Sequence, residues 1–441
     1  MLTDPIVALA SGPGRSALAV IRLSGEGAFQ VAATVIRAFA AEPTRAARLA
    51  EFLGPDGLAV DQGLYLTFAA PRSYTGQDLV ELTCHGGLLV PGQLLAALQA
   101  AGARPALPGE FTRRAVFNGK LDLLQAEAVG DLVDATATAQ ARSALRQLEG
   151  GLSRRLGSLR DRFLDLLAML GYEVDFPEED DGPIARDQLL VQLGRTITEV
   201  EHLLATAPAG ERLREGALVV LAGRPNAGKS SLFNALLGTD RALVTEIPGT
   251  TRDTIEAHSE IAGWPVRLAD TAGIWDAPTR LDQLGIVVSR RYLTAADLVL
   301  LCVESGEELL DEDRAILRDC PTLLIRTKVD LGSEPGTGVP VSIVTGQGIP
   351  ELRQAMVERL FAEGNSYGDM EPLLTRERHR VGLTRALEQL RAAVPHLTPE
   401  GDPVLAAHHV LAAVRAVDEL VGAVGVEDVL DQIFSRFCVG K

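Results

Sequence analysis

One short segment constrains the fold of this 441-residue chain more than any other feature. The run Gly223-Arg-Pro-Asn-Ala-Gly-Lys-Ser230 fits the pattern GxxxxGK(S/T) and directly follows the aliphatic segment 217–222. In this pattern backbone N–H groups close around the α- and β-phosphates, Lys229 reaches the β- and γ-phosphates, and the Ser230 hydroxyl binds Mg²⁺. A turn with a capped helix is the alternative, but a chance match is expected in only roughly one chain in a hundred of this length. The segment predicts a phosphate-binding loop between a strand and a helix.

Two segments that suit a metal-bound triphosphate follow this loop. Asp270-Thr-Ala-Gly273 comes after a short strand at 266–268, where the carboxylate can hold Mg²⁺ through water and a glycine N–H can contact the γ-phosphate. Gly249-Thr-Thr-Arg-Asp253 lies between the two motifs, where a loop can bring the Thr251 hydroxyl to the metal. By itself the Asp270 motif would be a common turn, and its position in the series is what gives it meaning.

Two further segments indicate the base. Thr327-Lys-Val-Asp330 follows the apolar segment 322–326, and Ser342-Ile-Val344 follows another short strand. The Asp330 carboxylate can accept hydrogen bonds from N1–H and N2–H of guanine, which adenine cannot supply. The five segments in this order predict a GTPase rather than an ATPase. The predicted GTP-binding residues are Asn226, Ala227, Gly228, Lys229, Ser230, Ser231, Thr245, Glu246, Ile247, Pro248, Gly249, Thr250, Thr251, Asp270, Thr271, Ala272, Gly273, Thr327, Lys328, Val329, Asp330, Ser342, Ile343 and Val344.

The surrounding sequence divides into parts with different periodicity. Residues 1–118 combine short strands, at 6–10, 17–23, 64–69 and 78–85, with one helix near 91–101, which indicates a small α+β domain. Residues 216–365 alternate aliphatic segments with helices, as a doubly wound parallel sheet does. The simplest architecture inserts this α/β domain into a helical one.

The helical part is indicated by apolar residues at steps of three and four. One series predicts a single long helix: Leu145, Leu148, Leu152, Leu156, Leu159, Phe163, Leu166 and Leu170. An acidic segment at 175–181 contains a proline and is expected to be a solvated loop. A second helix is predicted from Leu189, Leu193, Ile197, Val200 and Leu204, and residues 376–441 are again helical and aliphatic.

The formal charge of −17 is unevenly distributed. Residues 1–118 hold nine Arg and nine acidic residues, so the remainder, with 33 basic and 50 acidic residues, carries all of it. Two different surfaces, and therefore at least two domains, are implied. The negative sign argues against a protein that wraps a nucleic acid by neutralising phosphates alone.

The four cysteines and the apolar segments indicate the compartment. Cys84, Cys302, Cys320 and Cys438 form no CxxC pair, so neither a zinc framework nor a redox dithiol is indicated. Few scattered cysteines fit a reducing environment. There is no stretch of 18 apolar residues, and the N-terminus lacks a basic segment ahead of an apolar one. We expect a cytoplasmic protein without a membrane partner.

Over essentially its whole length the sequence resembles the MnmE (TrmE) family of bacterial tRNA wobble-uridine modification GTPases. Outside the GTPase motifs, the resemblance is carried by segments 13–25, 73–87, 108–128 and 175–179, and by the terminus Phe437-Cys-Val-Gly-Lys441. It implies a multidomain α/β and α protein. The implied domains are an N-terminal α+β folate-binding and dimerisation domain (1–118), a helical domain in two parts (119–212 and 369–441), and an inserted Ras-like α/β P-loop GTPase domain (213–368).

The resemblance also implies an activity and partners. Members of the family work as homodimers with the FAD-dependent flavoprotein MnmG (GidA) to place an aminomethyl or carboxymethylaminomethyl group on C5 of the wobble uridine. The one-carbon unit comes from 5-formyl-tetrahydrofolate or a related folate. By position, the implied folate-binding residues are Arg22, Glu81, Lys120 and Lys441. A carboxylate can accept from pterin N–H groups, and Arg or Lys can pair with the glutamate tail.

The GTPase of this family resembles those that K⁺ and G-domain dimerisation activate without an arginine finger. The implied K⁺ ligands are Asn226, Thr245, Ile247 and Thr250, and the implied Mg²⁺ ligands are Ser230 and Thr251. A K⁺ ion near the β- and γ-phosphates would neutralise developing negative charge. The implied catalytic residues are Asp282, Lys229 and Thr251.

Two positions depart from the family pattern. The usual Glu that orients the attacking water corresponds to Asp282, which is one methylene shorter. The usual Asn of the guanine motif is Thr327, which is expected to lose the contact with guanine N7. For Cys438 a nucleophilic role is one reading and simple packing near the folate pocket is the other.

Two other functions compete with that of a tRNA-modifying GTPase. A regulatory or ribosome-assembly GTPase usually appends a basic RNA-binding module, and after residue 365 Asp and Glu outnumber Lys and Arg. An autonomous folate-dependent transferase would need a redox group, yet the sequence has no flavin or pyridoxal fingerprint. From the charge we expect weak tRNA binding by this chain alone, with the flavoprotein supplying most phosphate contacts.

Overall fold

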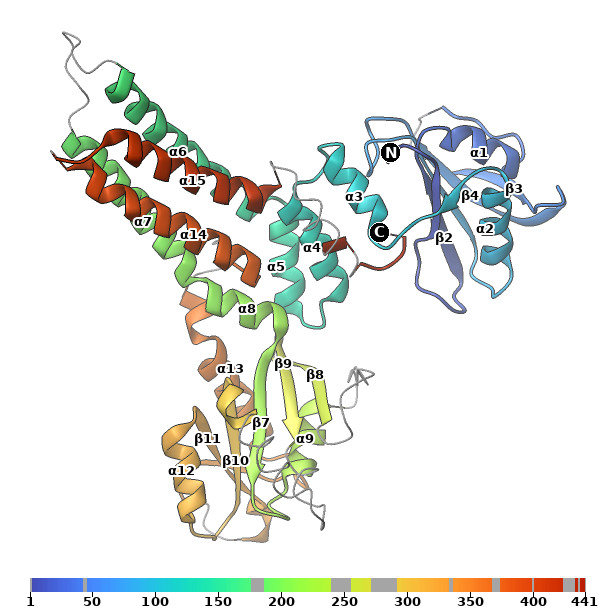
Figure 1. Ribbon diagram of the computed structural model, residues 1–441. Coiled ribbons are helices and arrows are strands. Elements are labelled where there is room, and N and C mark those ends of the chain that lie inside the picture. The colour runs from blue at the N-terminus through green and yellow to red at the C-terminus, as the bar shows by residue number, and fades with distance from the viewer. Residues whose placement is uncertain are drawn as a thin grey trace, which may run out of the picture. The chain divides into compact units, whose positions relative to one another are not determined.

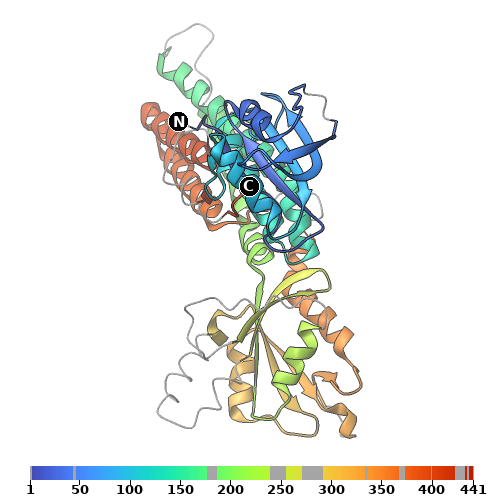
Figure 2. The same ribbon diagram turned by 90° about the vertical axis from the view of Figure 1, so that its right-hand side faces the viewer.

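The computed structural model describes residues 2–42, 46–175, 186–238, 255–270, 292–332, 336–366, 373–398, 400–422, 433–434 and 437–440 (Figures 1 and 2). These residues form two compact units, Met1–Gly130 with Asp418–Lys441, and Asp131–Val417. The second unit contains a helical part and a six-stranded sheet. No described helix is both long enough and apolar enough to cross a membrane.

The first unit is built on a six-stranded sheet in the order β3-β4-β5-β2-β1-β6. All neighbours pair antiparallel except β1 and β6, which are parallel. The strands are β1 (Ile6–Leu9), β2 (Leu18–Ser24), β3 (Arg48–Leu53), β4 (Ala59–Phe68), β5 (Leu79–His85) and β6 (Arg104–Pro105). Helices α1 (Ala28–Val35) and α2 (Val90–Ala100) share one apolar core with the sheet. The strands predicted at 6–10, 17–23 and 78–85 are therefore present.

Strand periodicity decides which side chains of this sheet remain outside that core. Ile21 and Leu23 of β2 and Leu82 of β5 are fully buried in the core with α1 and α2. Because successive side chains of a strand point to opposite faces, Arg22 and Glu81 lie on the other face. The antiparallel register places these two residues directly opposite each other.

The rest of the first unit consists of α3 (Glu110–Phe117), the part of α4 (Leu123–Asp134) up to Gly130, and the end of the chain. Phe434 is buried against Leu123 and Ala126 of α4, and the Phe437 ring packs beside it. Gly440 has φ +101°, and a Cβ there would lie 2.3 Å from the Leu9 carbonyl oxygen. The C-terminal segment thus returns to the N-terminal sheet.

The helical part of the second unit contains α5 (Thr138–Leu148), α6 (Gly151–Asp175), α7 (Arg186–Ala205), α8 (Ala207–Glu215), α14 (Glu377–Ala393), η2 (Val394–Leu397) and α15 (Pro403–Val421). The prediction of one long helix from Leu145 to Leu170 is wrong at its start. The chain breaks between α5 and α6 at Gly150, which has φ +83° and donates its N–H to the Gln147 carbonyl. Leu145 is consequently exposed, because it belongs to a different helix from Leu152 and the residues after it.

The second leucine series correctly predicts a helix, α7, but it identifies only part of the buried face of that helix. Leu189, Leu193 and Val200 of α7 are buried as expected. The buried face continues through Thr196 and Leu203 rather than through Ile197 and Leu204. A helix that packs along one stripe alternates steps of four and three, so a polar residue can occupy a buried position that a search for apolar residues passes over.

The sheet of the second unit has the order β12-β11-β10-β7-β9-β8. Every pair is parallel except the hairpin β8–β9. The strands are β7 (Ala217–Gly223), β8 (Ile255–Ile261), β9 (Trp264–Asp270), β10 (Leu298–Glu304), β11 (Thr322–Thr327) and β12 (Val339–Val341), and the helices are α9 (Lys229–Leu237), α12 (Asp311–Asp319), η1 (Val329–Leu331) and α13 (Ile349–Ser366). One core joins the sheet to α9 and α13, and residues of α12 pack against a second core on the opposite face. The predicted doubly wound sheet is confirmed.

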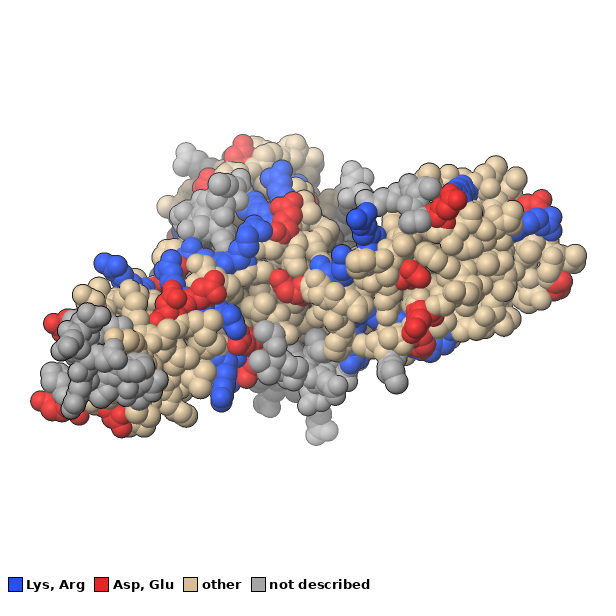
Figure 3. All heavy atoms as spheres, turned by 90° about the horizontal axis from the view of Figure 1, so that it is seen from above, with Lys and Arg blue, Asp and Glu red and all other residues tan. Residues whose placement is uncertain are grey.

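Several charged side chains of the helical part form ion pairs. Arg380 pairs with Glu211 at 3.0 Å and Arg391 with Glu201 at 2.7 Å. The view in Figure 3 accordingly has Lys and Arg interspersed with Asp and Glu.

Candidate functional site

The phosphate loop connects β7 to α9, and its conformation requires glycine at two points. Gly223 has φ +135°, and a Cβ there would lie 2.2 Å from the Cys302 carbonyl oxygen of the neighbouring strand β10. Gly228, with φ +84°, immediately precedes α9. Asn226 also has a positive φ, of 63°, which asparagine tolerates better than most residues. The loop therefore turns sharply from the end of a buried strand into the helix.

Lys229 and Ser230 make the first polar contacts of this site. The Lys229 ammonium donates to the carbonyl oxygens of Gly223 at 2.9 Å and Arg224 at 2.8 Å, and the residue is 6% exposed. The Ser230 hydroxyl donates to Oδ2 of Asp270 at 2.9 Å. Because β9 lies next to β7 and is parallel to it, the Asp270 carboxylate at its end reaches the start of α9. A hydroxyl beside a carboxylate is an oxygen donor set of the kind that Mg²⁺ prefers.

The guanine motif lies at the end of β11. Lys328 adopts φ +59°, and its ammonium pairs with Oε2 of Glu304 at 2.7 Å. The left-handed turn leads into η1, on which Asp330 is exposed. Ser342 is fully buried after β12, and its hydroxyl accepts a hydrogen bond from the Thr345 N–H at 3.2 Å. The motif therefore presents its aspartate to solvent from a locally braced turn.

Thr327 links the guanine motif to the phosphate loop. Its hydroxyl donates to the Ala227 carbonyl oxygen at 2.9 Å, and the residue is 2% exposed. A buried hydroxyl with this partner has no path to a base in solvent, so the side chain acts on the loop. The sequence reading, which considered only the lost contact with guanine N7, missed this contact. No local signal could have found it, because the partners are 100 residues apart.

Burial makes the cysteine beneath the loop unreactive. Cys302 is fully buried in β10, and desolvation raises the pKa of its thiol to about 12 even though the Lys229 charge favours the thiolate. At neutral pH it remains protonated. Cys302 therefore supports the loop by packing and offers no nucleophile.

Several predicted residues lie outside the described residues. They are Thr245, Glu246, Ile247, Pro248, Gly249, Thr250, Thr251, Thr271, Ala272, Gly273, Asp282 and Lys441. Of the predicted K⁺ ligands the structure describes Asn226, and of the predicted Mg²⁺ ligands it describes Ser230. Within the described ranges, no group of three or more His, Cys, Asp or Glu side chains could hold a metal ion.

A second cluster of polar groups lies on the face of the first unit's sheet that is opposite α1 and α2. Nε and Nη2 of Arg22 donate to Oε1 of Glu81 at 2.9 and 2.7 Å. The guanidinium carbon lies 5.3 Å from the ring centre of Tyr74 and 5.7 Å from that of Phe111. Nη1 also reaches the Gly440 carbonyl oxygen at 3.4 Å. Distant segments of the chain thus meet at one arginine.

This cluster offers chemistry that fits a pterin. The Arg22 and Glu81 side chains are 21% and 24% exposed, so an acceptor and a donor are both accessible beside aromatic rings. The Tyr74 hydroxyl lies 2.8 Å from that of Thr112, and burial raises its pKa, so it remains a neutral donor or acceptor. Lys120 is exposed, and its Cγ would lie 3.3 Å from a Cβ placed on Gly76.

A buried arginine network supports α3 behind this face, and sequence reasoning missed it. Arg114 is fully buried and pairs with Glu110 at 2.9 Å and with Asp4 at 3.0 Å, while Arg104 pairs with Glu110 at 2.6 Å. Burial by itself would raise the pKa of Glu110, but hydrogen bonds from Arg104, the Leu107 N–H and Arg114 lower it to about 2. The spacing of Glu110 and Arg114, four residues apart on one helix, was the signal that could have found this pair.

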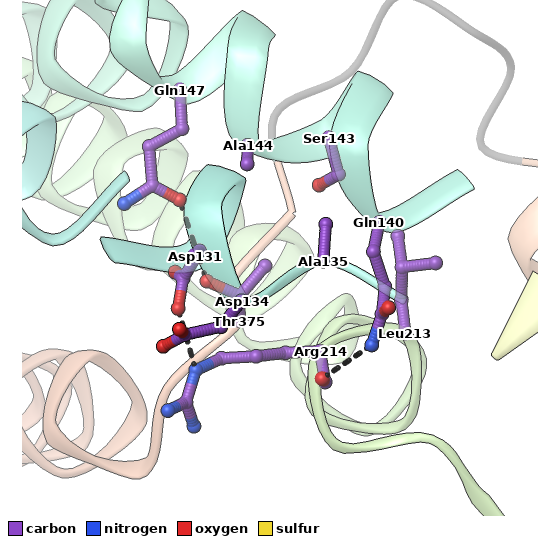
Figure 4. Close-up of a pocket in the computed structure, with 10 residues that line it drawn as sticks. All are labelled: Asp131, Asp134, Ala135, Gln140, Ser143, Ala144, Gln147, Leu213, Arg214 and Thr375. Atoms are coloured by element: carbon purple, nitrogen blue, oxygen red, sulfur yellow. Dashed lines mark hydrogen bonds and ion pairs between the residues drawn. The ribbon is translucent and has the colours of Figure 1, made fainter. Parts of the chain in front are cut away.

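A small polar pocket lies in the second unit where the chain enters and leaves the doubly wound sheet (Figure 4). Its volume is about 100 Å³. On one wall Asp131 accepts from Arg214, which precedes β7, at 3.1 Å and from Arg376, which precedes α14, at 2.7 Å. Its lining residues are Asp131, Asp134, Ala135, Gln140, Ser143, Ala144, Gln147, Leu213, Arg214 and Thr375. One carboxylate therefore holds both connections to the inserted sheet.

Known proteins are similar to this chain over its whole length. Two family models match: "MnmE helical domain" over residues 123–438 and "GTP-binding protein TrmE N-terminus" over residues 5–120. Proteins named tRNA modification GTPase MnmE are similar over 100% of this chain. The one from Akkermansia muciniphila is 40% identical, over 100% of its own length, and one from Thermus thermophilus is 44% identical, over 99%.

A solved structure is similar over a smaller region. The G domain of the T. maritima FeoB iron transporter shares 31% identity over 32% of this chain and 98% of its own, with a TM-score of 0.26. At that score the likeness adds nothing to the geometry of the phosphate loop. The full-length relatives and the contacts described above therefore indicate the function.

Proposed function

The chain belongs to the MnmE family of tRNA modification GTPases, and we propose that it is the GTP-hydrolysing subunit of a complex that modifies C5 of the wobble uridine in tRNA. The observation that carries this proposal is the combination, in one chain, of a phosphate loop braced by Lys229, Ser230 and Asp270 with full-length similarity to named tRNA modification GTPases. The transferred group is an aminomethyl or carboxymethylaminomethyl group, and its one-carbon unit comes from a folate.

In this proposal GTP is the substrate of the second unit. The loop N–H groups of 226–231 bind the α- and β-phosphates, and Lys229 exchanges its carbonyl partners for phosphate oxygens. Ser230, with Thr251, would hold Mg²⁺, which would neutralise phosphate charge. The Asp330 carboxylate selects guanine because it accepts hydrogen bonds from the N1–H and N2–H groups of the base. Thr327 keeps the phosphate loop and the guanine motif in register through the Ala227 carbonyl.

Turnover is assigned to K⁺ and to Asp282. Asn226, Thr245, Ile247 and Thr250 would hold the monovalent cation, which supplies positive charge near the transferred phosphoryl group. Asp282 orients the attacking water, with two G domains meeting to complete the site.

GTP hydrolysis is expected to be several-fold faster in K⁺ than in Na⁺, measured as phosphate release at equal ionic strength. Equal rates in both salts would remove the cation from the mechanism.

The folate is assigned to the first unit. Glu81 accepts from ring N–H groups, while Arg22, Lys120 and Lys441 pair with negative charge on the ligand. The support is the accessible Arg22–Glu81 pair beside Tyr74 and Phe111. We assign homodimer formation to this unit, and the redox step to the flavoprotein MnmG, which also supplies most tRNA contacts. Tight tRNA binding by this chain alone at physiological salt would contradict that division.

One experiment separates this function from that of a GTPase switch in ribosome assembly. Mass analysis of wobble uridine in tRNA from cells lacking this protein should find the C5 modification missing. Re-expression of the wild-type chain should restore it. Normal wobble uridine together with accumulated ribosomal precursors would favour the switch instead.

A further inference from the structure

The second residue of the phosphate loop, Arg224, is held by contacts that the loop motif does not require. The pattern GxxxxGK(S/T) leaves this position open. Nη1 of Arg224 pairs with Oε2 of Glu307 at 3.0 Å, and Nη2 pairs with Oδ2 of Asp313 at 2.9 Å and donates to the Glu308 carbonyl oxygen at 2.6 Å. One guanidinium therefore makes three contacts with the single segment 307–313.

The principal acceptor is itself fixed in place. The Asp313 side chain is 6% exposed, and its Oδ2 also accepts the Leu310 N–H at 2.9 Å at the start of α12. A carboxylate in the first turn of a helix is stabilised by the helix dipole as well as by this hydrogen bond. Arg224 is thus tied to a rigid point, unlike an arginine paired with a mobile surface acid.

The main chain of Arg224 carries this restraint to the lysine of the loop. Its carbonyl oxygen accepts from the Lys229 ammonium at 2.8 Å and from the Ala227 N–H at 3.3 Å. Fixing the side chain therefore fixes the peptide around which the loop closes. Because two carboxylates neutralise the guanidinium, it is unsuited to bind phosphate directly.

The same acidic segment also holds the guanine motif. Glu304 pairs with Lys328 at 2.7 Å, and the Glu307 carbonyl oxygen accepts from Nη1 of Arg326 at 2.7 Å. Residues 304–313, which we call the acidic brace, therefore contact both halves of the nucleotide site. Such a connection sets the separation between the loop and the motif before the nucleotide arrives.

We propose that Arg224 is a positioning residue for GTP: held by the acidic brace, it keeps the phosphate loop in the conformation that accepts the phosphates. The inference rests on the proposed role of 223–230 as the GTP phosphate loop. Pre-organisation lowers the cost of ordering a loop when the ligand binds. Because this benefit applies equally to the ground state and the transition state, its loss raises KM and leaves kcat nearly unchanged.

The test is steady-state GTP hydrolysis by the full chain in K⁺ buffer. Arg224→Ala should raise the KM for GTP about tenfold, as expected for loss of charged hydrogen bonds, with kcat changed by less than about twofold. Arg224→Lys, which keeps the charge, should recover about half of the loss on a logarithmic scale. Asp313→Asn keeps the acceptor for the Leu310 N–H and removes the charge. It therefore tests the Arg224–Asp313 pair by changing the acid instead of the arginine.

The matched control is Arg318→Ala, which removes an exposed ion pair with Asp319, 2.8 Å long, on the same helix α12. It should leave KM within about twofold of wild type. Combining Arg224→Ala with Asp313→Asn should raise KM no further than Arg224→Ala alone, because Arg224→Ala already removes the Arg224–Asp313 ion pair that Asp313→Asn weakens.

Three results would overturn the proposal. They are an Arg224→Ala KM equal to wild type, a fall in kcat with unchanged KM, and additive effects in the double variant. If Arg224→Ala does not fold, Asp313→Asn and Arg224→Lys decide the same question. A wild-type chain that does not hydrolyse GTP would instead refute the proposed function itself, so the two failures are distinguishable.

Discussion

The two six-stranded sheets carry their candidate sites in different places. In the largely parallel sheet of the second unit, Gly223, Asp270 and Thr327 stand at the carboxyl ends of β7, β9 and β11. In the largely antiparallel sheet of the first unit, Arg22 and Glu81 stand in the middle of paired strands, on the face opposite α1 and α2. The site of the second unit therefore consists of loops at one edge of a sheet, whereas the site of the first unit consists of side chains on the face of a sheet.

This difference has a physical origin. Parallel strands connected by crossover helices bring all their carboxyl ends to one edge, where loops with free N–H groups gather. Antiparallel strands have no common end, so a polar site must use alternation across the ladder. The loop site therefore depends on backbone conformation and the face site on strand register. Substitutions should affect the two sites independently.

The largest expected effect separates the sites most clearly. Lys229→Ala should reduce GTP turnover by at least about 100-fold, because the loop loses the charge that neutralises the β- and γ-phosphates. Folate binding by the same variant, measured by calorimetry, should equal that of wild type. Loss of both GTP turnover and folate binding would mean that the two sites are coupled.

The next effect concerns the support behind the face site. Glu110→Gln should lower the local free energy of unfolding around α3 by about 2 kcal/mol at pH 7, because Arg104 and buried Arg114 lose one of the two carboxylates that they share. Faster hydrogen exchange of peptides covering 108–118 is the measurement. GTP turnover in the second unit should not change.

The pH dependence follows from the same residue. The folded-state pKa of Glu110, about 2, lies below the ordinary value of 4.5, so its ionised form stabilises the protein fully above pH 4.5. That contribution is lost as the pH falls from 4.5 towards 2. The difference between wild type and Glu110→Gln should shrink over this range. A difference that stays constant down to about pH 2.5 would contradict the ionic origin.

A smaller effect is expected at the face itself. Arg22→Gln should weaken folate binding about tenfold, since one charged partner and the cation–π contacts with Tyr74 and Phe111 are removed. Titration with 5-formyl-tetrahydrofolate measures the change. Arg48→Gln, which alters another partly exposed arginine of the same sheet, paired with Glu42 at 3.0 Å, is the control. Equal affinities in wild type and Arg22→Gln would remove this residue from the site.

The smallest effect tests the contact between the loop and the guanine motif. Thr327→Val keeps the shape and removes the hydrogen bond to Ala227, so GTP affinity should fall about threefold to tenfold. Thr327→Ser should restore it. If Thr327→Val binds GTP as tightly as wild type, the hydroxyl does not act through the loop.

Much of the fold was readable from local patterns. β7 and β11 begin at the aliphatic segments that predict them, because strands buried on both faces are continuously apolar. The leucine series failed at Gly150, where a glycine in left-handed conformation ends a helix that periodicity alone would continue. The spacing of apolar residues indicates which face of a helix is buried, but it does not indicate where one helix ends and the next begins in a new direction.

The candidate sites were readable to different degrees. The phosphate loop was predictable because its glycines and lysine lie within eight consecutive residues, and glycine is needed at Gly223, where a Cβ would meet the neighbouring backbone. The face site came only through family resemblance, since nothing near Arg22 indicates that Glu81, 59 residues away, is its partner. Arg224 and Thr327 were missed in their roles for the same reason.

The sequence by itself determined that a nucleotide loop follows a buried strand, that the base is guanine, and that negative charge lies beyond residue 118. Those properties depend on neighbouring residues or on composition. Only the tertiary structure decided that Arg22 faces Glu81, that Asp131 holds both connections to the inserted sheet, and that Asp313 anchors Arg224. Each of these contacts joins residues far apart in the chain, and strand register and helix packing set the distances between them.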